Sequence, residues 1–192
     1  MQEMAWLMTG ITQRNDITIN EGECLSPIQR GQVFLCERGS PMKWLIMLVV
    51  ISIDQASKWW VIHHLKEIGT IKIIDGIFHL HYLENRGAAF GIFQDQRLFF
   101  LVVNTLITCI IIGYLVKHPV MNRLLMWSLI LIAGGAIGNI IDRALYGYVI
   151  DFFDFQIWPV FNVADSAIVV GQALLIFYIL RHGKDEVAGD AS

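Results

Sequence analysis

Four long runs of apolar residues, separated by polar connections, dominate the chain. They cover residues 44–62, 98–116, 124–141 and 163–180. Each has 18 or 19 residues, close to the roughly 20 that a helix needs to cross the hydrocarbon core of a bilayer. A soluble core could bury one such helix, but four in 192 residues would leave nothing to cover them. The pattern predicts a mainly α membrane protein with four transmembrane helices.

The first 41 residues differ from the rest. They mix polar and apolar positions without a period, and they lack the basic and apolar regions of a secretory signal. Lys43 then places a positive charge immediately before the first apolar run. We therefore expect either that Met42 is the functional start or that residues 1–41 are a dispensable cytoplasmic N-terminal extension, and that residues 42–192 form one four-span domain.

An even number of spans fixes which connections share a side of the membrane. The long connections 63–97 and 142–162 lie on one side, and both termini lie on the other with the short link 117–123. Lys117 and Arg123 give that link a high density of positive charge, which is typical of cytoplasmic loops. We expect cytoplasmic termini and extracytoplasmic long connections.

Two aspartates beside the last two runs are the main candidates for chemistry. Asp151 lies in the connection 142–162, and Asp165 opens the fourth run behind Asn162, a suitable helix N-cap. A carboxylate near membrane depth is costly unless it is paired or has a function. Two adjacent carboxyl groups can share one proton and activate a water molecule, as in aspartic proteases.

Other polar residues gather at the same side. Asp54 and Lys58 are four residues apart on one helical face, which favours an ion pair; a structural clamp is a better interpretation of this pair than catalysis. Asn139 and Asp142 end the third run, where Gly134 and Gly138 form a small-residue face that would let a neighbouring helix approach closely. We expect that approach to bring the end of the third run against the start of the fourth.

The first long connection predicts a β-hairpin. Residues 70–74 and 77–83 are rich in β-branched and aromatic side chains and flank Asp75 and Gly76, a typical two-residue turn. Such a ribbon could bind an extended peptide through its main chain, or it could be an ordinary interfacial hairpin.

The composition bears on whether the protein binds nucleic acid, contains disulfides or holds a metal ion. The chain is 55% hydrophobic and 16% charged, with a net charge of −3 and no basic tract, so nucleic acid is not an expected partner. Cys24, Cys36 and Cys109 form no CxxC pair, and the histidine pairs have no candidate thiolate nearby. Neither a disulfide framework nor a metal site is expected.

Five motifs occur in one order: DQASK (54–58), NRGAAF (85–90), GGAIGNIIDR (134–143), VIDF (149–152) and FNVADS (161–166). In these motifs the chain from Met42 onward closely resembles the lipoprotein signal peptidases, the type II signal peptidases of bacteria. The resemblance implies a four-helix inner-membrane protein with a small extracytoplasmic β-cradle, acting as a monomer without metal or organic cofactor. It also implies an aspartic endopeptidase that cleaves diacylglyceryl-modified prolipoproteins before the lipidated cysteine, at the membrane surface.

The resemblance assigns catalysis to Asp151 and Asp165. The residues that it implies for substrate binding or support are Asp54, Lys58, Asn85, Gly87, Asn139, Asp142, Arg143, Asn162 and Ala164. Asp142 is the one that could be mistaken for a member of the catalytic pair, because it also lies at the outer membrane surface.

Two other functions are compatible with parts of the pattern. A small proton-coupled transporter or channel would use buried acids as a proton pathway, but it would leave the hairpin and the NRGAAF motif without a role. A non-catalytic assembly subunit for lipoproteins would keep the fold and tolerate loss of either aspartate.

Overall fold

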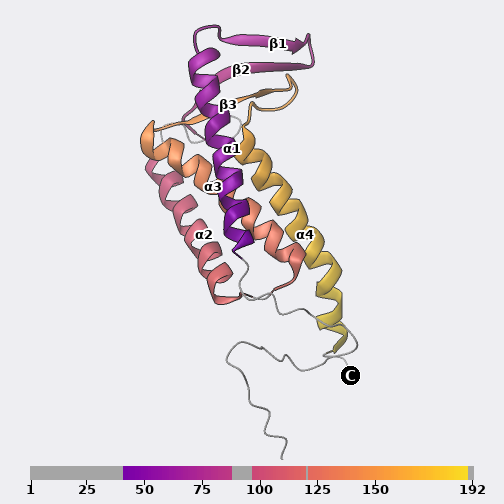
Figure 1. Cartoon of the computed structure of the whole chain (residues 1–192). Helices are drawn as coiled ribbons and strands as arrows, with labels where there is room; N and C mark the ends of the chain where they lie inside the picture. Colours follow the sequence, from indigo (N-terminus) through magenta and orange to yellow (C-terminus); the bar gives the residue numbers. More distant parts are fainter. Residues whose placement is uncertain (1–40, 88–96, 120, 190–192) are drawn as a thin grey trace, which may run out of the picture. The chain divides into compact units, whose positions relative to one another are not determined.

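The computed structural model describes residues 41–87, 97–119 and 121–189. These residues form the helices α1 (Met42–His64), α2 (Arg97–Lys117), α3 (Arg123–Leu145) and α4 (Val163–Gly189), and the strands β1 (Thr70–Ile74), β2 (Phe78–Asn85) and β3 (Val149–Asp154) (Figure 1). Predictions for residues 1–40, Cys24 and Cys36 among them, and for residues 88–90 of the NRGAAF motif fall outside the described residues.

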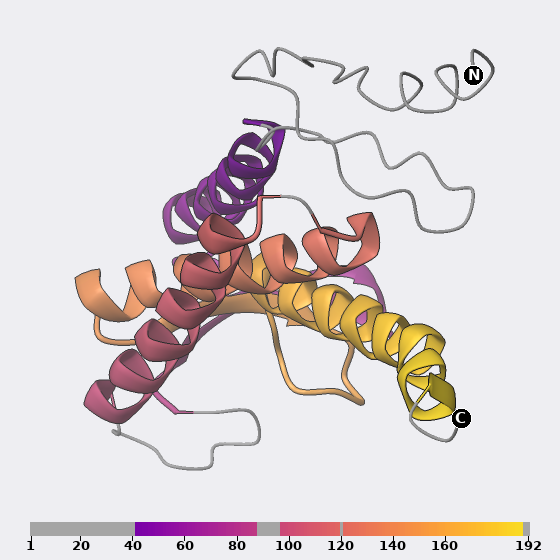
Figure 2. The ribbon, with the colours of Figure 1, turned by 90° about the horizontal axis from the view of Figure 1, so that it is seen from below.

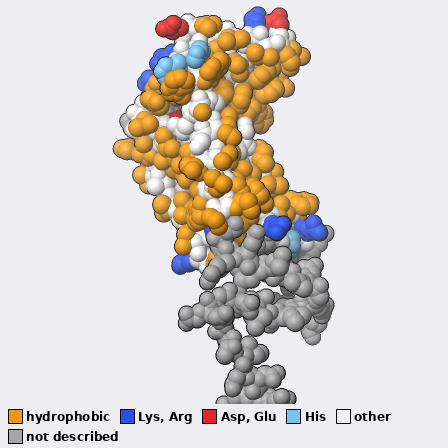
Figure 3. All heavy atoms as spheres, viewed as in Figure 1, with side chains coloured by type: hydrophobic (Ala, Val, Ile, Leu, Met, Phe, Trp, Pro, Cys, Tyr) orange, Lys and Arg blue, Asp and Glu red, His pale blue; other side chains and the backbone are white. Residues whose placement is uncertain are grey.

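All four helices are long and apolar enough to cross a membrane, which confirms the predicted fold class. Large apolar side chains remain exposed on them, as expected for surfaces that face lipid; Leu98 is 74% exposed and Leu180 66%. Hydrophobic atoms dominate the visible face in Figure 3. α3 is the most buried helix and packs against the other three, and Figure 2 shows them arranged around it.

One face of α1 is buried in the interior of the protein. Its buried residues are Lys43, Met47, Asp54, Lys58 and Val61. Their spacing of three, four and seven residues places them on one helical stripe. Met47 belongs to an apolar cluster between α1, α2 and α3, whereas Val61 belongs to a second cluster beneath the sheet. The charged Asp54 and Lys58 lie between these two clusters along the stripe.

The strands form one antiparallel sheet in the order β1-β2-β3. The hairpin of β1 and β2 confirms the sequence prediction, but its turn differs. Ile74 pairs with Phe78, so three residues, Asp75 to Ile77, make the turn, and Gly76 supplies the left-handed conformation with φ +72°.

β3 was not among the predicted elements, since the sequence placed Asp151 in the connection 142–162 without assigning a strand there. Its first four residues are all buried. A strand buried on both faces lacks the alternation of apolar and polar residues by which strands are recognised. Asp151 of β3 pairs with Leu83 of β2. This pairing places Asp151 at the end of the helix bundle that carries the sheet.

The glycine-rich segment of α3 packs closely, and the end of α3 meets the start of α4 as predicted, where Asn139 donates to Asp165. The helix that faces Gly134 and Gly138 differs from the prediction. A side chain at Gly134 would meet Val50 of α1, and one at Gly138 would overlap the Asp54 carboxylate. The helix that approaches the Gly134 and Gly138 face is therefore mainly α1. Contact with α4 depends instead on Gly135, where a Cβ would overlap the carbonyl oxygen of Ala164.

Candidate active site

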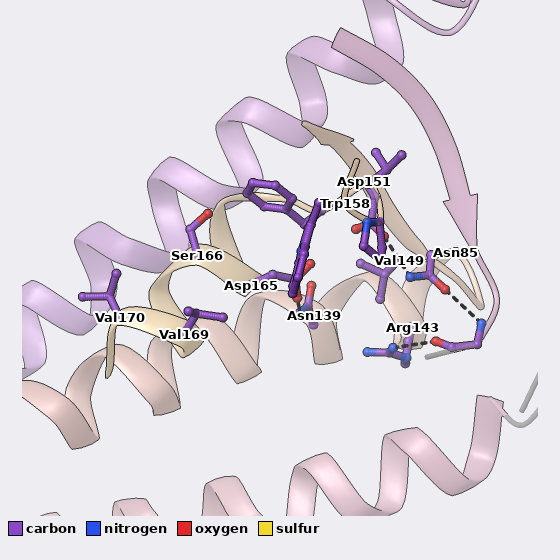
Figure 4. A pocket seen from close by; sticks show the side chains of 14 residues that line it. Asn85, Asn139, Arg143, Val149, Asp151, Trp158, Asp165, Ser166, Val169 and Val170 are labelled. Atoms are coloured by element: carbon purple, nitrogen blue, oxygen red, sulfur yellow. Dashed lines mark hydrogen bonds between the residues drawn. The ribbon is translucent and has the colours of Figure 1, made fainter. Parts of the chain in front are cut away.

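A pocket of about 520 Å³ lies between the sheet, the end of α3 and the start of α4. Its lining residues come from the end of β2 and from the stretch that runs from the end of α3 into α4: Asn85, Gly87, Asn139, Arg143, Val149, Asp151, Trp158, Pro159, Val160, Phe161, Asp165, Ser166, Val169 and Val170. Figure 4 shows Asp151 and Asp165 approaching the pocket from β3 and α4 respectively. The two aspartates, separated by the loop between these elements, thus share one cavity.

Asp165 is positioned by the start of α4. Its backbone N–H donates to the side-chain oxygen of Asn162 at 2.9 Å, and its Oδ2 accepts from the backbone N–H of Asn162 at 3.3 Å. This reciprocal arrangement caps the helix and confirms Asn162 as its N-cap. The cap fixes the Asp165 carboxylate at the first turn, where helix N–H groups and the helix dipole favour negative charge.

Asp151 is held by two amide side chains. Asn162 Nδ2 donates to its Oδ1 at 2.7 Å, and Asn85 Nδ2 donates to its Oδ2 at 2.8 Å. Asp151 is 1% exposed. Burial and the neighbouring charge of Asp165 raise the pKa of Asp151 to about 7, although both amide hydrogen bonds lower it. Near neutral pH this carboxyl group is therefore poised to hold or release a proton.

A third amide connects the aspartates to a buried cation. Lys58 Nζ donates to Asn139 Oδ1 at 3.2 Å, and Asn139 Nδ2 donates to Asp165 Oδ1 at 2.7 Å. Because an ammonium group can only donate, it fixes the Asn139 oxygen toward Lys58 and the nitrogen toward Asp165. Asn162 Nδ2 also lies 3.2 Å from Asn139 Oδ1. The network thus presents hydrogen-bond donors to both aspartates.

The predicted pair of Asp54 and Lys58 is present, with a second acid beside it. Lys58 Nζ lies 2.9 Å from Asp54 Oδ2 and 2.8 Å from Asp142 Oδ2. With Asn139, these partners use all three ammonium protons. A buried ion pair persists when its remaining lone pairs are also satisfied. Asp54 Oδ1 accepts from the backbone N–H of Ala164 at 2.9 Å, which ties α1 to the first turn of α4.

Asp142 lies behind the pocket rather than in it. Its Oδ1 accepts from Gln55 Nε2 at 3.1 Å, and its Oδ2 accepts from Lys58 and from the backbone N–H of Ile150 at 3.1 Å. It is fully buried and does not line the pocket. This carboxylate therefore joins α1, α3 and β3.

Arg143 stands at the wall of the pocket nearest α2. Its guanidinium donates to the carbonyl oxygen of Gly87 at 3.4 Å and lies over the ring of Phe100, 5.4 Å from the centroid. The backbone N–H of Gly87 in turn donates to Asn85 Oδ1 at 3.1 Å. A cation and a polar backbone turn are thus held at the pocket wall, near Asp151.

The structure brings every predicted site residue into one connected region. Six line the pocket, namely Asn85, Gly87, Asn139, Arg143, Asp151 and Asp165. The other five, Asp54, Lys58, Asp142, Asn162 and Ala164, support them from behind. No group of three or more potential metal ligands occurs among the residues that the structure describes.

Sequence reasoning missed several residues of this region, Gln55, Trp158 and Ser166 among them. Gln55 Nε2 lies within hydrogen-bonding distance of Asp54, Asp142 and the Gly138 carbonyl, so it closes the charged cluster. Its position directly after Asp54 in the first motif was the available signal. Ser166 lines the pocket as well, and its place directly after Asp165 at the end of the FNVADS motif was a similar signal. Trp158 lines the pocket without any signal in its local sequence.

Comparison with known proteins identifies the family of the chain. The profile of the family described as Signal peptidase (SPase) II matches residues 46–181, which contain every predicted site residue. The chain belongs to the signal peptidase II family. Membership of this family and the four apolar helices make it a multi-pass membrane protease.

Individual signal peptidase II relatives match most of the chain. A lipoprotein signal peptidase of Halothermothrix orenii is 44% identical over 146 residues, which cover 74% of this chain and 98% of that protein. One from Clostridioides difficile is 46% identical over 140 residues, which cover 71% and 93%.

Two solved structures, both described as bacterial membrane enzymes determined by the in meso method, share the fold. The 2.3 Å structure has a TM-score of 0.69 and 31% identity, and the match covers 75% of this chain and 90% of that one. The 1.9 Å structure has a TM-score of 0.64 and 32% identity, and the match covers 72% and 92%.

Proposed function

We propose that this protein is an aspartic endopeptidase that removes signal peptides from diacylglyceryl-modified prolipoproteins, cleaving before the lipidated cysteine. One observation carries the proposal: Asp151 and Asp165 line the same pocket, and each accepts a hydrogen bond from an asparagine amide. The names of the relatives, lipoprotein signal peptidases, support the substrate class.

The proposed mechanism uses one proton shared by the two aspartates. Two adjacent buried carboxyl groups do not both ionise, so one remains protonated while the other is a base. The base removes a proton from a water molecule as its oxygen attacks the scissile carbonyl carbon. The acid donates its proton to the carbonyl oxygen, which produces a tetrahedral diol.

Breakdown of the diol completes the reaction. The carboxyl group that gained the water proton passes it to the amide nitrogen, and the carbon–nitrogen bond breaks. A hydroxyl proton of the diol returns to the other carboxylate as the new carboxylic acid forms, so the pair again holds one proton. Because the pair titrates as a unit, the roles are assigned to the pair.

The surrounding groups have distinct proposed roles. Asn139 and Asn162 fix the two carboxyl groups through their amide nitrogens. Asn85 and Arg143 lie at the pocket wall, where they can donate to substrate carbonyl oxygens. Lys58, paired with Asp54 and Asp142, contributes no free charge to the pocket.

The proposed function also implies a location, a membrane orientation and an oligomeric state. We infer that the protein resides in the bacterial inner membrane with cytoplasmic termini and the pocket at the extracytoplasmic face, where the signal helix and the lipid anchor of a translocated substrate meet. We also propose that the protein acts as a monomer.

A proton-coupled transporter is not favoured. In the described spans the acidic residues are Asp54, Asp142 and Asp165, and all three belong to one connected region. A proton pathway would need acids distributed through the depth of the membrane.

The decisive experiment is cleavage of a diacylglyceryl-modified prolipoprotein by the purified protein and by Asp151→Asn, Asp165→Asn and Asp142→Asn. Asp75→Asn is the matched control, because its side chain is 80% exposed in the hairpin turn. We expect cleavage before the lipidated cysteine by the parent and the control, and loss of at least about a thousandfold in Asp151→Asn and Asp165→Asn. Thermal unfolding in detergent checks that each variant folds.

The Asp142→Asn variant tests whether Asp142 is a supporting residue or a catalytic one. It should lower the unfolding temperature, because Lys58 loses a charged partner. If cleavage survives Asp151→Asn but is lost in a folded Asp142→Asn variant, the catalytic pair would consist of Asp142 and Asp165 instead. A well-folded parent that cleaves no lipidated substrate would overturn the proposed function.

A further inference from the structure

The pocket has an apolar part that the proposed chemistry does not use. Beyond Asp165 its lining continues with Val169 and Val170 on α4, and Trp158 also lines the pocket. Figure 4 shows Ser166, Val169 and Val170 following one another along the helix from Asp165. Val169 is 62% exposed, Val170 51% and Trp158 63%, so this wall is open to the surroundings.

This wall leads from the carboxyl pair to the lipid-facing surface of α4. Val169 and Val170 lie within the part of α4 that is apolar enough to span a membrane. A hydrocarbon chain dissolved in the bilayer could therefore reach the pocket without crossing water, and tryptophan is favoured where an apolar surface meets the membrane interface.

Trp158 is presented by a turn that the fold holds rigidly. Gln156 has a left-handed conformation with φ 63°, which is unfavourable for a residue with a side chain. Its backbone N–H donates to Asp154 Oδ1 at 2.9 Å, and its Nε2 lies 2.7 Å from Asp154 Oδ2 and 3.0 Å from Nδ1 of the buried His79. These contacts stabilise a backbone conformation that would otherwise relax.

Aromatic rings fix the two sides of the same turn. Phe155 stacks on Phe161 with ring centroids 5.9 Å apart, and its ring centroid lies 4.8 Å from that of Phe78 in β2. Phe153 and Phe161 pair through their backbones across the base of the loop. The exposed Trp158 is thus supported by an ordered base.

We propose that Trp158, Val169 and Val170 form a subsite for an acyl chain of the lipid-modified substrate, with Gln156 as the residue that positions Trp158. This inference rests on the proposed function and adds the element that selects the lipid. Hydrocarbon is the occupant that fits, because these three side chains are apolar and two of them, Val169 and Val170, belong to a membrane span. A substrate whose lipid is attached next to the scissile bond would place its acyl chains along this wall.

Kinetics with two synthetic substrates tests the subsite. Diacylglyceryl peptides that differ only in acyl chain length, short or long, are compared for the parent, Trp158→Ala and Trp158→Phe. Ile157→Ala is the matched control, since Ile157 precedes Trp158 in the same turn, is 95% exposed and does not line the pocket. The parent should have a lower KM for the long-chain peptide.

Trp158→Ala should raise KM for the long-chain peptide about tenfold with little change in kcat, and should abolish the preference for long chains. Trp158→Phe should restore part of the preference, and Ile157→Ala should retain it fully. A merely structural role would instead affect both peptides equally, and equal effects on both would overturn the subsite. Gln156→Ala should also weaken the preference, because the turn loses its contacts with Asp154 and His79.

Crosslinking gives an independent answer. A long-chain peptide with a photoreactive diazirine in one acyl chain is bound to the inactive Asp165→Asn variant, irradiated and mapped by mass spectrometry. We expect adducts on segments that contain Trp158, Val169 or Val170. Adducts confined to α2 or the β1–β2 hairpin, with a parent that does cleave lipidated peptides, would refute the subsite alone. A folded parent that cleaves neither peptide would refute the proposed function and the subsite with it.

Discussion

The side-chain nitrogen of Asn162 lies 2.7 Å from Oδ1 of Asp151, eleven residues earlier in the chain. Asn162 also caps α4 and exchanges two hydrogen bonds with Asp165. One residue therefore sets the positions of both candidate catalytic carboxyl groups. Its two tasks use different atoms, so they can be separated by substitution.

Asn162→Ser should separate helix capping from contact with Asp151. Serine is a good N-cap but its side chain is too short to reach Asp151, so stability should stay close to that of the parent while cleavage falls at least tenfold. Asn162→Ala loses both functions and should also cost about 1 kcal/mol of stability. Unfolding temperatures and cleavage rates measure the two effects. Equal activity of Asn162→Ser and the parent would contradict this assignment.

The raised pKa of Asp151 predicts how stability changes with pH. The folded-state pKa of about 7 exceeds the ordinary value of 3.8, so the folded protein holds this proton more tightly than the unfolded chain does. The stabilising contribution is complete below about pH 4 and is lost as the pH rises toward 7. The unfolding temperature of the parent should therefore fall over this range relative to that of Asp151→Asn. Parallel curves for the two proteins would argue against the raised pKa.

Close packing of α3 against α4 should depend on Gly135. An alanine there would overlap the Ala164 carbonyl and bring its Cβ within 2.8 Å of Ile168, so we expect a loss of about 1–3 kcal/mol and impaired cleavage, because the start of α4 must shift. Gly113→Ala is the control, since a Cβ at that helical position meets nothing within 4 Å. Thermal unfolding and cleavage should show no penalty for Gly113→Ala. Similar behaviour of the two variants would contradict the packing argument.

Lys58 should be far more important for stability than Lys66. Lys58→Met leaves Asp54 and Asp142 buried without their cation, which should cost about 3–5 kcal/mol. Lys66 pairs with Glu84 at 3.5 Å with its side chain 49% exposed, so Lys66→Met should cost less than about 1 kcal/mol. Chemical or thermal unfolding in detergent compares the two. A small effect of Lys58→Met would mean that the acids become protonated without penalty.

Much of the fold was accessible from the sequence, because bilayer thickness imposes a length on each apolar run. The pair of Asp54 and Lys58 was predictable as well, since helical spacing alone brings them together. Their third partner, Asp142, was not, because tertiary packing of α3 against α1 decides that contact. β3 was missed because burial of both faces removes its alternating pattern.

The candidate site was predictable only in part. Residue chemistry alone indicated Asp151 and Asp165 as a possible pair, and the resemblance to the lipoprotein signal peptidases added the supporting residues. Trp158 could not be predicted, because its place in the pocket depends on the left-handed backbone of Gln156 and on a turn fixed by residues of β2 and β3.

The contact between Asp54 and Lys58 within α1 has a consequence for biosynthesis. A span that enters the bilayer before later segments are translated cannot use Asp142 or Ala164 to satisfy its charges. The 2.9 Å pair is available as soon as one turn of helix forms, so the two charges in the middle of α1 can enter the bilayer as a neutralised pair. When α3 and α4 arrive, Lys58 gains Asp142 and Asp54 gains the Ala164 N–H. The same two side chains thus first permit membrane insertion and then select the helices that assemble around them.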